Sequence, residues 1–242
     1  MKREHSAGIG IYKKSKNKTK FLFLIKDNGR IDLPKGHIEN KESEVEAALR
    51  ETKEETGLTG EIERFAKKEI NYFFFNGKEK IFKKLTMFLG RIKKGKIKIS
   101  EEHASYKWMT ADEAIKKVKF KNEKELIEYA EDYVKKIDLI KKINNDYASL
   151  PLKCKDWKIS NRFVPGEGPL DAKIFLIGQA PGAKEDIEKR PFVGPSGKLL
   201  DDVIKKSGLT REQLYITSVV QFYPPKNRAP SKDKPNNIGH LC

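Results

Sequence analysis

Alternating and continuous apolar runs divide the chain into short strands and amphipathic helices. Residues 8–12 (GIGIY) and 21–25 (FLFLI) are β-rich runs separated by a turn rich in Lys and Asn, which predicts a hairpin. Three more strands and two helices are expected after it: strands 68–75, 81–92 and 106–109, then helices 111–118 and 123–136. The pattern predicts a closed α+β unit over residues 1–136.

An amphipathic helix is predicted from Ser43 to Thr56. Glu46 stands three residues after Ser43, as in a capping box, and Gly57 is placed to end the helix. Four carboxylates fall within one arc of it: Glu44, Glu51, Glu54 and Glu55. Four other residues form the face expected to pack: Val45, Ala48, Leu49 and Thr52.

A second domain is expected after a joint. Residues 137–150 suggest one more helix with a polar break at 144–146, so we assign 137–148 as a linker helix and 149–242 as the second domain. The pattern after the joint predicts a β-loop-α-β unit, made of strand 173–178, a Gly/Pro loop, helix 196–207 and strand 215–222. Few residues follow this unit, so we expect a truncated doubly wound α/β domain.

Charge and cysteine content narrow the class of protein. The 51 Lys and Arg exceed the 35 Asp and Glu, giving a net charge of +16 that attracts nucleotides or nucleic acid; a thermophile-like surface composition explains it equally well. The two cysteines, Cys154 and Cys242, exclude a disulfide framework and fit a reducing cytoplasm. No apolar run is long enough to span a membrane, so a soluble, cytoplasmic protein with no membrane partner is expected.

Like-charged carboxylates on one arc of a helix repel one another unless a cation neutralises them. Mg²⁺ prefers carboxylate and water oxygens and keeps positions open for substrate phosphates. Arg50 can brace Glu54 one turn further on and so orient it. The alternative is a solvated Glu/Lys helix, which three acids at helical spacing would not by themselves rule out.

The whole segment 36–58 (GHIENKESEVEAALRETKEETGL) resembles the Nudix box, with the fixed residues Gly36, Glu42, Arg50, Glu51, Glu54, Glu55 and Gly57. Thr52 stands where an aliphatic residue is usual; since Thr is nearly isosteric with Val, weaker packing is expected, with catalysis retained. The resemblance implies a Nudix α/β/α sandwich that hydrolyses nucleotide pyrophosphate bonds with Mg²⁺, or with Mn²⁺. The residues it implies for the metal are Gly36, Glu51, Glu54, Glu55 and Glu102, and those for catalysis are Glu54, Glu51, Glu102 and Arg50.

Two further segments resemble the diadenosine tetraphosphate hydrolases: 33–39 (LPKGHIE), and Glu101-Glu102-His103 followed by Tyr106 and Trp108. The resemblance implies that Glu102 is a further metal ligand or base and that Tyr106 stacks on adenine. Lys35 would contact the phosphate chain, assisted by His37, with Tyr72 as a second stacking ring. Ordinary core packing is the alternative for each aromatic, because residues 72–75 (YFFF) also suggest a buried strand. Ile31 departs from the Trp common among relatives.

The second half resembles family 4 uracil-DNA glycosylases in its motifs 164–168 (VPGEG), 178–182 (GQAPG), 190–194 (RPFVG), 215–220 (YITSVV) and 224–230 (PPKNRAP). The resemblance implies a pocket in which Phe192 stacks on a flipped base, with Gln179 and Ser218 beside it. Gln179 replaces an acidic residue and Ser218 an Asn of the family, which puts base specificity in doubt.

An iron-sulfur cluster is not expected in this chain. The family binds its cluster with four cysteines, and the alignment places a cysteine of this chain, Cys154, at one of those positions, with Pro151 at the first and Ile238 at the third. Two cysteines cannot supply four thiolates. The His-Pro loop of the family is also missing, since no Pro follows His240. We therefore expect a partial glycosylase domain, inactive by itself, whose remainder could be separately encoded.

Two functions follow from these readings. The first is a Mg-dependent Nudix hydrolase of nucleoside polyphosphates, with diadenosine tetraphosphate as the leading substrate. The alternative is a uracil-DNA glycosylase-like repair protein that binds DNA through its basic C-terminal half, with the Nudix domain as a nucleotide-sanitising module.

Overall fold

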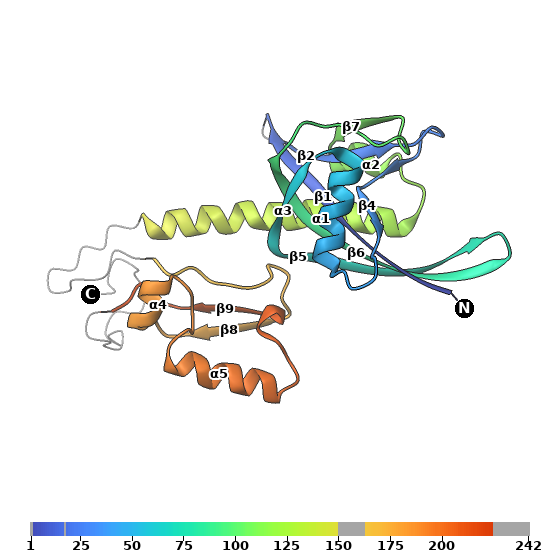
Figure 1. The fold of residues 1–242 in the computed structure, drawn as a ribbon. Helices are drawn as coiled ribbons and strands as arrows, with labels where there is room; N and C mark the ends of the chain where they lie inside the picture. Colours follow the sequence, from blue (N-terminus) through green and yellow to red (C-terminus); the bar gives the residue numbers. More distant parts are fainter. Residues whose placement is uncertain (1, 17, 150–162, 225–242) are drawn as a thin grey trace. The chain divides into compact units, whose positions relative to one another are not determined.

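The computed structural model describes residues 2–16, 18–149 and 163–224 of the chain (Figure 1). The chain divides into two compact units, Met1–Lys135 and Lys136–Cys242, and each is described by itself. Among the described residues, no helix combines the length and the apolar character needed to cross a membrane.

The first unit is built on a mixed sheet whose strands run in the order β3-β2-β1-β6-β5, with β4 paired to β1 and β7 paired to β2. Its strands are β1 (Lys2–Ser15), β2 (Lys18–Ile25), β3 (Ile31–Asp32), β4 (Lys35–His37), β5 (Thr59–Asn76), β6 (Glu79–Lys94) and β7 (Ser105–Met109). Strand β1 pairs antiparallel with β2, as the hairpin prediction required, and parallel with β6.

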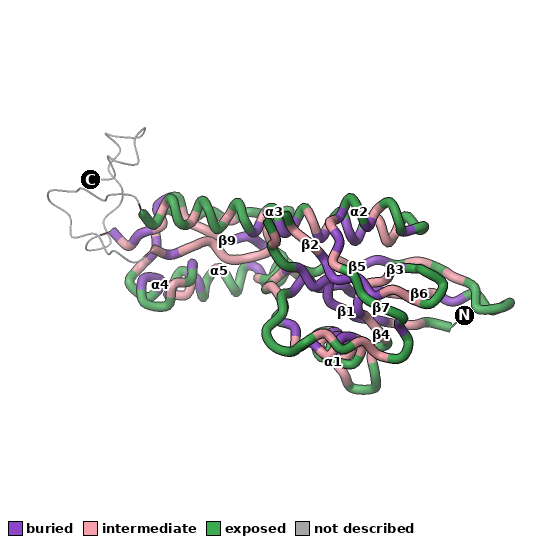
Figure 2. Tube along the Cα trace, turned by 90° about the horizontal axis from the view of Figure 1, so that it is seen from above, coloured by how far each residue is buried: buried purple, intermediate pink, exposed green. Residues whose placement is uncertain are grey.

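Helices cover both faces of this sheet, which confirms the sandwich architecture. Helix α1 (Glu44–Thr56) buries Ala47 and Ala48 against Ile9 and Ile11 of β1. On the other face, Leu126 of α3 (Lys121–Ala148) packs with residues of β5 and β6. Buried residues, drawn in purple in Figure 2, concentrate along β1, β2 and β6.

Several elements differ from their predicted bounds. Strand β5 begins at Thr59, well before the predicted residue 68. Its first part was not predicted because a register shift between Ile62 and Lys67, with Phe65 in a left-handed conformation (φ 68°), interrupts the alternation of apolar and polar residues. The short strands β3 and β4 were not predicted, since two or three residues carry no periodicity. Helix α2 (Ala111–Ile115) ends three residues early, whereas α3 continues through residues 144–146, where a break was expected.

The second unit contains the predicted β-loop-α-β element. Strands β8 (Ile174–Gly178) and β9 (Leu214–Ser218) pair in parallel, and α5 (Pro195–Lys206) places Ile204 against Leu214 and Ile216. The predicted strand 215–222 ends at Ser218, and an unpredicted short helix, α4 (Ala183–Glu188), lies within the Gly/Pro loop.

Candidate active site

Helix α1 begins and ends as its sequence predicts. The Ser43 hydroxyl accepts a hydrogen bond from the Glu46 backbone, and the Glu46 carboxylate accepts one from the Ser43 backbone. Gly57 adopts φ 71° at the C-terminus and its N–H bonds to the carbonyl of Lys53. Both ends of the helix are therefore defined by local chemistry, which sets the rotation of its carboxylates about the axis.

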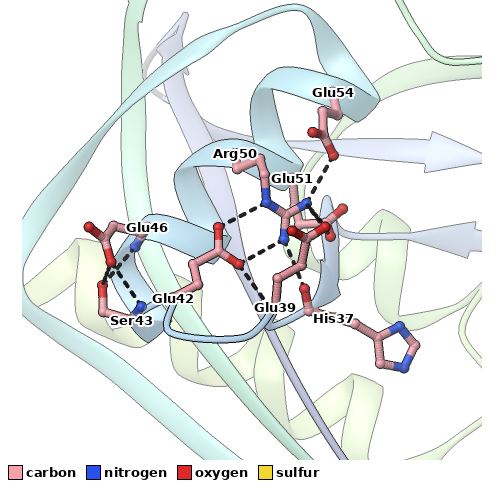
Figure 3. Close-up of polar contacts among 8 residues, drawn as sticks. All are labelled: His37, Glu39, Glu42, Ser43, Glu46, Arg50, Glu51 and Glu54. Atoms are coloured by element: carbon pink, nitrogen blue, oxygen red, sulfur yellow. Dashed lines mark hydrogen bonds and ion pairs between the residues drawn. The ribbon is translucent and has the colours of Figure 1, made fainter.

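Arg50 lies at the centre of the polar cluster on this helix (Figure 3). Its Nε and Nη2 donate to the two oxygens of Glu42 at 2.8 and 2.9 Å. Its Nη1 donates to Glu51 at 2.8 Å and to Glu54 at 3.0 Å, and Nη2 also reaches the carbonyl of His37 at 2.9 Å. All five N–H groups of the guanidinium are thus used, and the bidentate pair with Glu42 fixes its plane.

The carboxylate of Glu51 lies directly against Gly36. A Cβ added to Gly36 would stand 2.0 Å from Cδ of Glu51, so no side chain can replace this glycine without moving the carboxylate. The loop that carries Gly36 forms strand β4, which pairs with β1 and so holds the glycine next to the helix.

Glu55 points toward the same loop and is mostly buried, with 14% of its side chain exposed. Burial raises the pKa of Glu55 to about 7, helped by the charges of Asp32 and Glu51 and opposed by the hydrogen bond from the Lys35 backbone. Desolvation therefore makes the charged form of Glu55 costly unless a cation lies beside it.

The carboxylates suit a hard divalent cation by their chemistry. Among the described residues, no three acidic, His or Cys side chains are gathered closely enough to hold a metal ion, because Arg50 lies between Glu51 and Glu54 and Glu55 turns to Lys35. The donors are nevertheless all oxygens, the Gly36 cradle admits the Glu51 carboxylate, and burial disfavours the charged form of Glu55, which a bound cation would stabilise.

A pocket of about 440 Å³ lies on the α3 side of the sheet. Glu51, Glu54 and Glu55 are not among its lining residues, but Lys35, whose backbone N–H bonds to Glu55, is. Tyr72, Lys35 and Lys83 line the pocket, so two of the predicted substrate residues meet there. Asp32 also lines the pocket; burial alone would raise its pKa, but the Lys35 ammonium at 2.5 Å holds that pKa below its usual range.

Other predicted residues lie elsewhere. Tyr106 is 44% exposed on β7 and does not line the pocket, and Glu102 is exposed in the loop before β7. The His37 ring is also largely exposed and bonds to Glu4 at 3.1 Å. The structure therefore brings Lys35 and Tyr72 together, and separates them from Tyr106.

Two residues of this region were not assigned from the sequence. His103 is 6% exposed, its Nδ1 lies 3.2 Å from the Ser100 hydroxyl, and its Nε2 lies 3.9 Å from Glu55. Burial lowers the pKa of His103, which favours a neutral ring. Its position in the Glu-His segment was a usable signal, whereas nothing in the sequence around Asp32 marks it as a pocket residue.

The predicted faces of α1 need two corrections. Val45, expected to pack, is 44% exposed, and Ala47 is buried instead. Glu44 lies on the acidic arc but does not join the Arg50 cluster. Burial opposes its charge, but hydrogen bonds from Lys67, Thr86 and Lys84 lower the pKa of Glu44 to about 2.

In the second unit, the structure brings two of the predicted pocket residues together around Gly178. A Cβ on Gly178 would lie 2.6 Å from the Phe192 ring and 3.4 Å from Oγ of Ser218. Gln179 is the first residue after β8, and its backbone carbonyl accepts a hydrogen bond of 3.0 Å from the backbone N–H of Val220. Cys154, Pro151, Ile238 and His240, on which the iron-sulfur and loop expectations rest, lie outside the described residues.

The loop that carries Phe192 is held by a buried carboxylate. Glu185, 6% exposed, accepts hydrogen bonds from the backbone N–H groups of Gly182, Val193 and Gly194 at 3.1, 2.8 and 2.7 Å. Phe192 itself has φ 53°, a left-handed conformation that is uncommon for an aromatic residue and often found at functional positions.

Comparison with known proteins identifies the first unit. Residues 4–130, just over half of the chain, match the family model described as NUDIX domain. The chain belongs to the NUDIX family. Its NUDIX domain is 34% identical over 122 residues to the asymmetrical bis(5'-nucleosyl)-tetraphosphatase of Sus scrofa, covering 47% of this chain and 80% of that protein. A crystal structure of a C. elegans Ap4A hydrolase superposes with a TM-score of 0.45 at 27% identity, covering 52% of this chain and 93% of the other.

The remainder, outside the NUDIX domain, matches a second family. Residues 165–241 match the model described as Uracil DNA glycosylase superfamily. The type-4 uracil-DNA glycosylase of Sulfurisphaera tokodaii is 48% identical over 99 residues, which cover 40% of this chain and 44% of that protein. The chain thus spans less than half the length of this glycosylase relative.

Proposed function

We propose that the NUDIX domain hydrolyses a pyrophosphate bond of a nucleoside polyphosphate, with diadenosine tetraphosphate as the leading substrate and Mg²⁺ as the metal. The observation that carries this proposal is the Arg50 network, which holds Glu51 and Glu54 on one side of α1 beside Gly36. The asymmetrical bis(5'-nucleosyl)-tetraphosphatase named above supports the choice of substrate.

Glu51, Glu54 and Glu55 are the residues that would hold the metal, with the Gly36 loop and Glu102 as further candidates. When bound, a divalent cation lowers the pKa of water and neutralises charge on a leaving phosphate. Arg50 orients Glu51 and Glu54 through its hydrogen bonds. Glu54, with 58% of its side chain exposed, is the carboxylate best placed to accept a proton from attacking water.

The pocket beside Asp32 supplies the substrate contacts in this proposal. Tyr72 offers a ring for a base, and the ammonium groups of Lys35 and Lys83 offer charge for phosphates. Tyr106 stays a candidate for the distal adenine and His37 for the phosphate chain, since both side chains are exposed to solvent.

Hydrolysis of diadenosine tetraphosphate with Mg²⁺ tests the proposal directly. Glu54→Gln should reduce turnover by orders of magnitude, while Glu61→Gln, an exposed carboxylate on β5, should leave turnover unchanged. Equal turnover in the wild type and Glu54→Gln would contradict the mechanism. Mn²⁺ in place of Mg²⁺ should support the reaction, since it accepts the same oxygen ligands.

A second role is proposed for the C-terminal half, that of a partial glycosylase-like domain able to contact DNA. The contacts among Gly178, Phe192 and Ser218 favour a base-stacking site. The strand residues Phe175 and Ile177 are 55% and 63% exposed, which suits binding of an apolar partner surface. A duplex with a single uracil tests this: an abasic site produced by this chain alone would contradict the partial-domain reading.

We also propose the domain division 1–136, 137–148 and 149–242, in which the middle segment is the linker part of α3. Limited proteolysis tests it, because cleavage should concentrate in or after 137–148 and spare the NUDIX domain. Cleavage first within residues 1–136 would contradict this division.

A further inference from the structure

The aromatic run of residues 72–75 on strand β5 alternates between two faces of the sheet. Tyr72 and Phe74 are partly buried and line the pocket. Phe73, which is 52% exposed, also borders the pocket, whereas Phe75, which is 68% exposed, does not. The sequence suggested a buried strand here, with Tyr72 as a stacking ring for the substrate, and neither expectation explains why Phe73 and Phe75 are more than half exposed. Two large apolar side chains exposed next to each other on one strand are typical of a surface that binds a ligand or partner.

The exposed rings belong to a surface that the strand register defines. Phe73 is opposite Phe82 and Phe75 is opposite Lys80, so the four side chains share one face of the β5–β6 hairpin. The Phe73 and Phe82 rings meet edge to face with centroids 5.3 Å apart, and Nζ of Lys80 lies 4.5 Å from the centre of the Phe73 ring. We call these four residues the hairpin platform.

The Phe75 and Lys80 end of the hairpin platform lies beyond Ile81, the residue at which the pairing of β6 with β1 stops. Figure 1 shows the β5–β6 hairpin extending past α1, and residues 75–80 at its end are all exposed. Strand β5 also lies at the end of the strand order, so its outer edge faces solvent. A long ligand can therefore approach the platform from the side.

The charge around the platform favours a polyanion. Residues 67–84 contain six Lys and two Glu, and Arg3 of β1 is exposed and in register with Phe82. A second copy of the chain would bring another +16 charges toward this surface and be repelled. Exposed rings with interleaved cations are the arrangement on which unpaired bases stack while lysines contact the phosphates.

We propose that the hairpin platform binds single-stranded nucleic acid, at a site that extends from Phe73, on the border of the pocket beside Asp32, to the end of the hairpin. Bases stack on Phe75 and Phe73, and Lys80 contacts the backbone. Duplex bases are already stacked on one another, so the platform selects unpaired strands. The match of residues 165–241 to the uracil DNA glycosylase superfamily places a domain of DNA-related type on the same chain.

Fluorescence anisotropy of a labelled oligothymidylate, with the full chain at low salt, tests the proposal. Phe75→Ala combined with Lys80→Ala should weaken binding by at least about fivefold, the loss of one stacked base. The matched control is Leu139→Ala with Lys142→Ala on α3, which removes one exposed apolar side chain and one exposed lysine far along the sequence. Because Phe75 is 68% exposed, the hairpin variant should unfold at the temperature of the wild type.

Three results would overturn the proposal. One is no binding of the oligothymidylate by the wild type. Another is an equal loss of affinity in the hairpin and control variants, which would indicate unspecific attraction to net charge. The third is a wild-type dimer that the hairpin variant converts to a monomer, with unchanged oligothymidylate affinity, which would assign the platform to a second copy of the chain.

Discussion

The backbone N–H of Lys35 donates a hydrogen bond of 2.9 Å to Oε2 of Glu55. Lys35 lines the pocket and Glu55 belongs to the acidic helix, so this bond joins the two halves of the candidate active site. The Lys35 side chain meanwhile pairs with Asp32 inside the pocket. A change in the charge of Glu55 therefore alters the hydrogen bond to strand β4, which holds Lys35 at the pocket.

Arg50→Lys should lower hydrolysis while the domain stays folded. A lysine ammonium cannot make the bidentate pair with Glu42 and reach Glu51 and Glu54 at once, so the carboxylates lose their common orientation. Loss of such an orienting partner costs roughly 10- to 100-fold in activity or metal affinity. Arg91→Lys is the matched control. It alters the ion pair between Arg91 of β6 and Glu63 of β5 and should keep full activity.

Glu55→Gln should change the pH dependence of stability in metal-free protein. The pKa of Glu55 is raised to about 7 from its ordinary 4.5, so the folded state favours the protonated form. The wild type should then lose up to about 3 kcal/mol of unfolding free energy as the pH rises from 4.5 through 7, and the variant should not. Urea titrations at several pH values with a chelator measure this difference, and parallel curves would contradict it.

Tyr72→Ala and Tyr106→Ala separate the two candidate stacking rings. Tyr72 lines the pocket and Tyr106 does not, so the first change should raise KM for diadenosine tetraphosphate more than the second. Loss of one stacked base corresponds to roughly 1–3 kcal/mol. Steady-state kinetics of both variants settle the order, and a larger effect at Tyr106 would move the adenine site to β7.

Thr52→Val should stabilise the NUDIX domain. Thr52 is fully buried, and its Oγ1 has no hydrogen-bond partner among the described residues. Replacing an unsatisfied hydroxyl by a methyl of similar size should raise the unfolding free energy by about 1 kcal/mol. Thr56→Val is the contrasting control: its hydroxyl bonds to the Thr52 carbonyl and to the Leu58 N–H, so its loss should destabilise.

Local patterns predicted much of this fold because they act over a few residues. The capping box of Ser43 and Glu46 and the left-handed Gly57 define α1 without help from the rest of the chain. The match of segment 36–58 to a known motif likewise named Arg50 and its carboxylates. Strand β3 has two residues and therefore carries no periodicity, and the extension of β5 before residue 68 depends on pairing with the far end of β6, so both were missed.

The sequence by itself determined the two domain types, the acidic helix and the identity of its charged residues, because each depends on spacing within one segment. Only the tertiary structure decided which side chains meet. Strand pairing brings Asp32, Lys35 and Tyr72 into one pocket, whereas Tyr106 lies outside that pocket. The tertiary structure also left Phe73 and Phe75 exposed to solvent. They lie on β5, the last strand of the sheet, where no helix among the described residues covers the outer face of the hairpin.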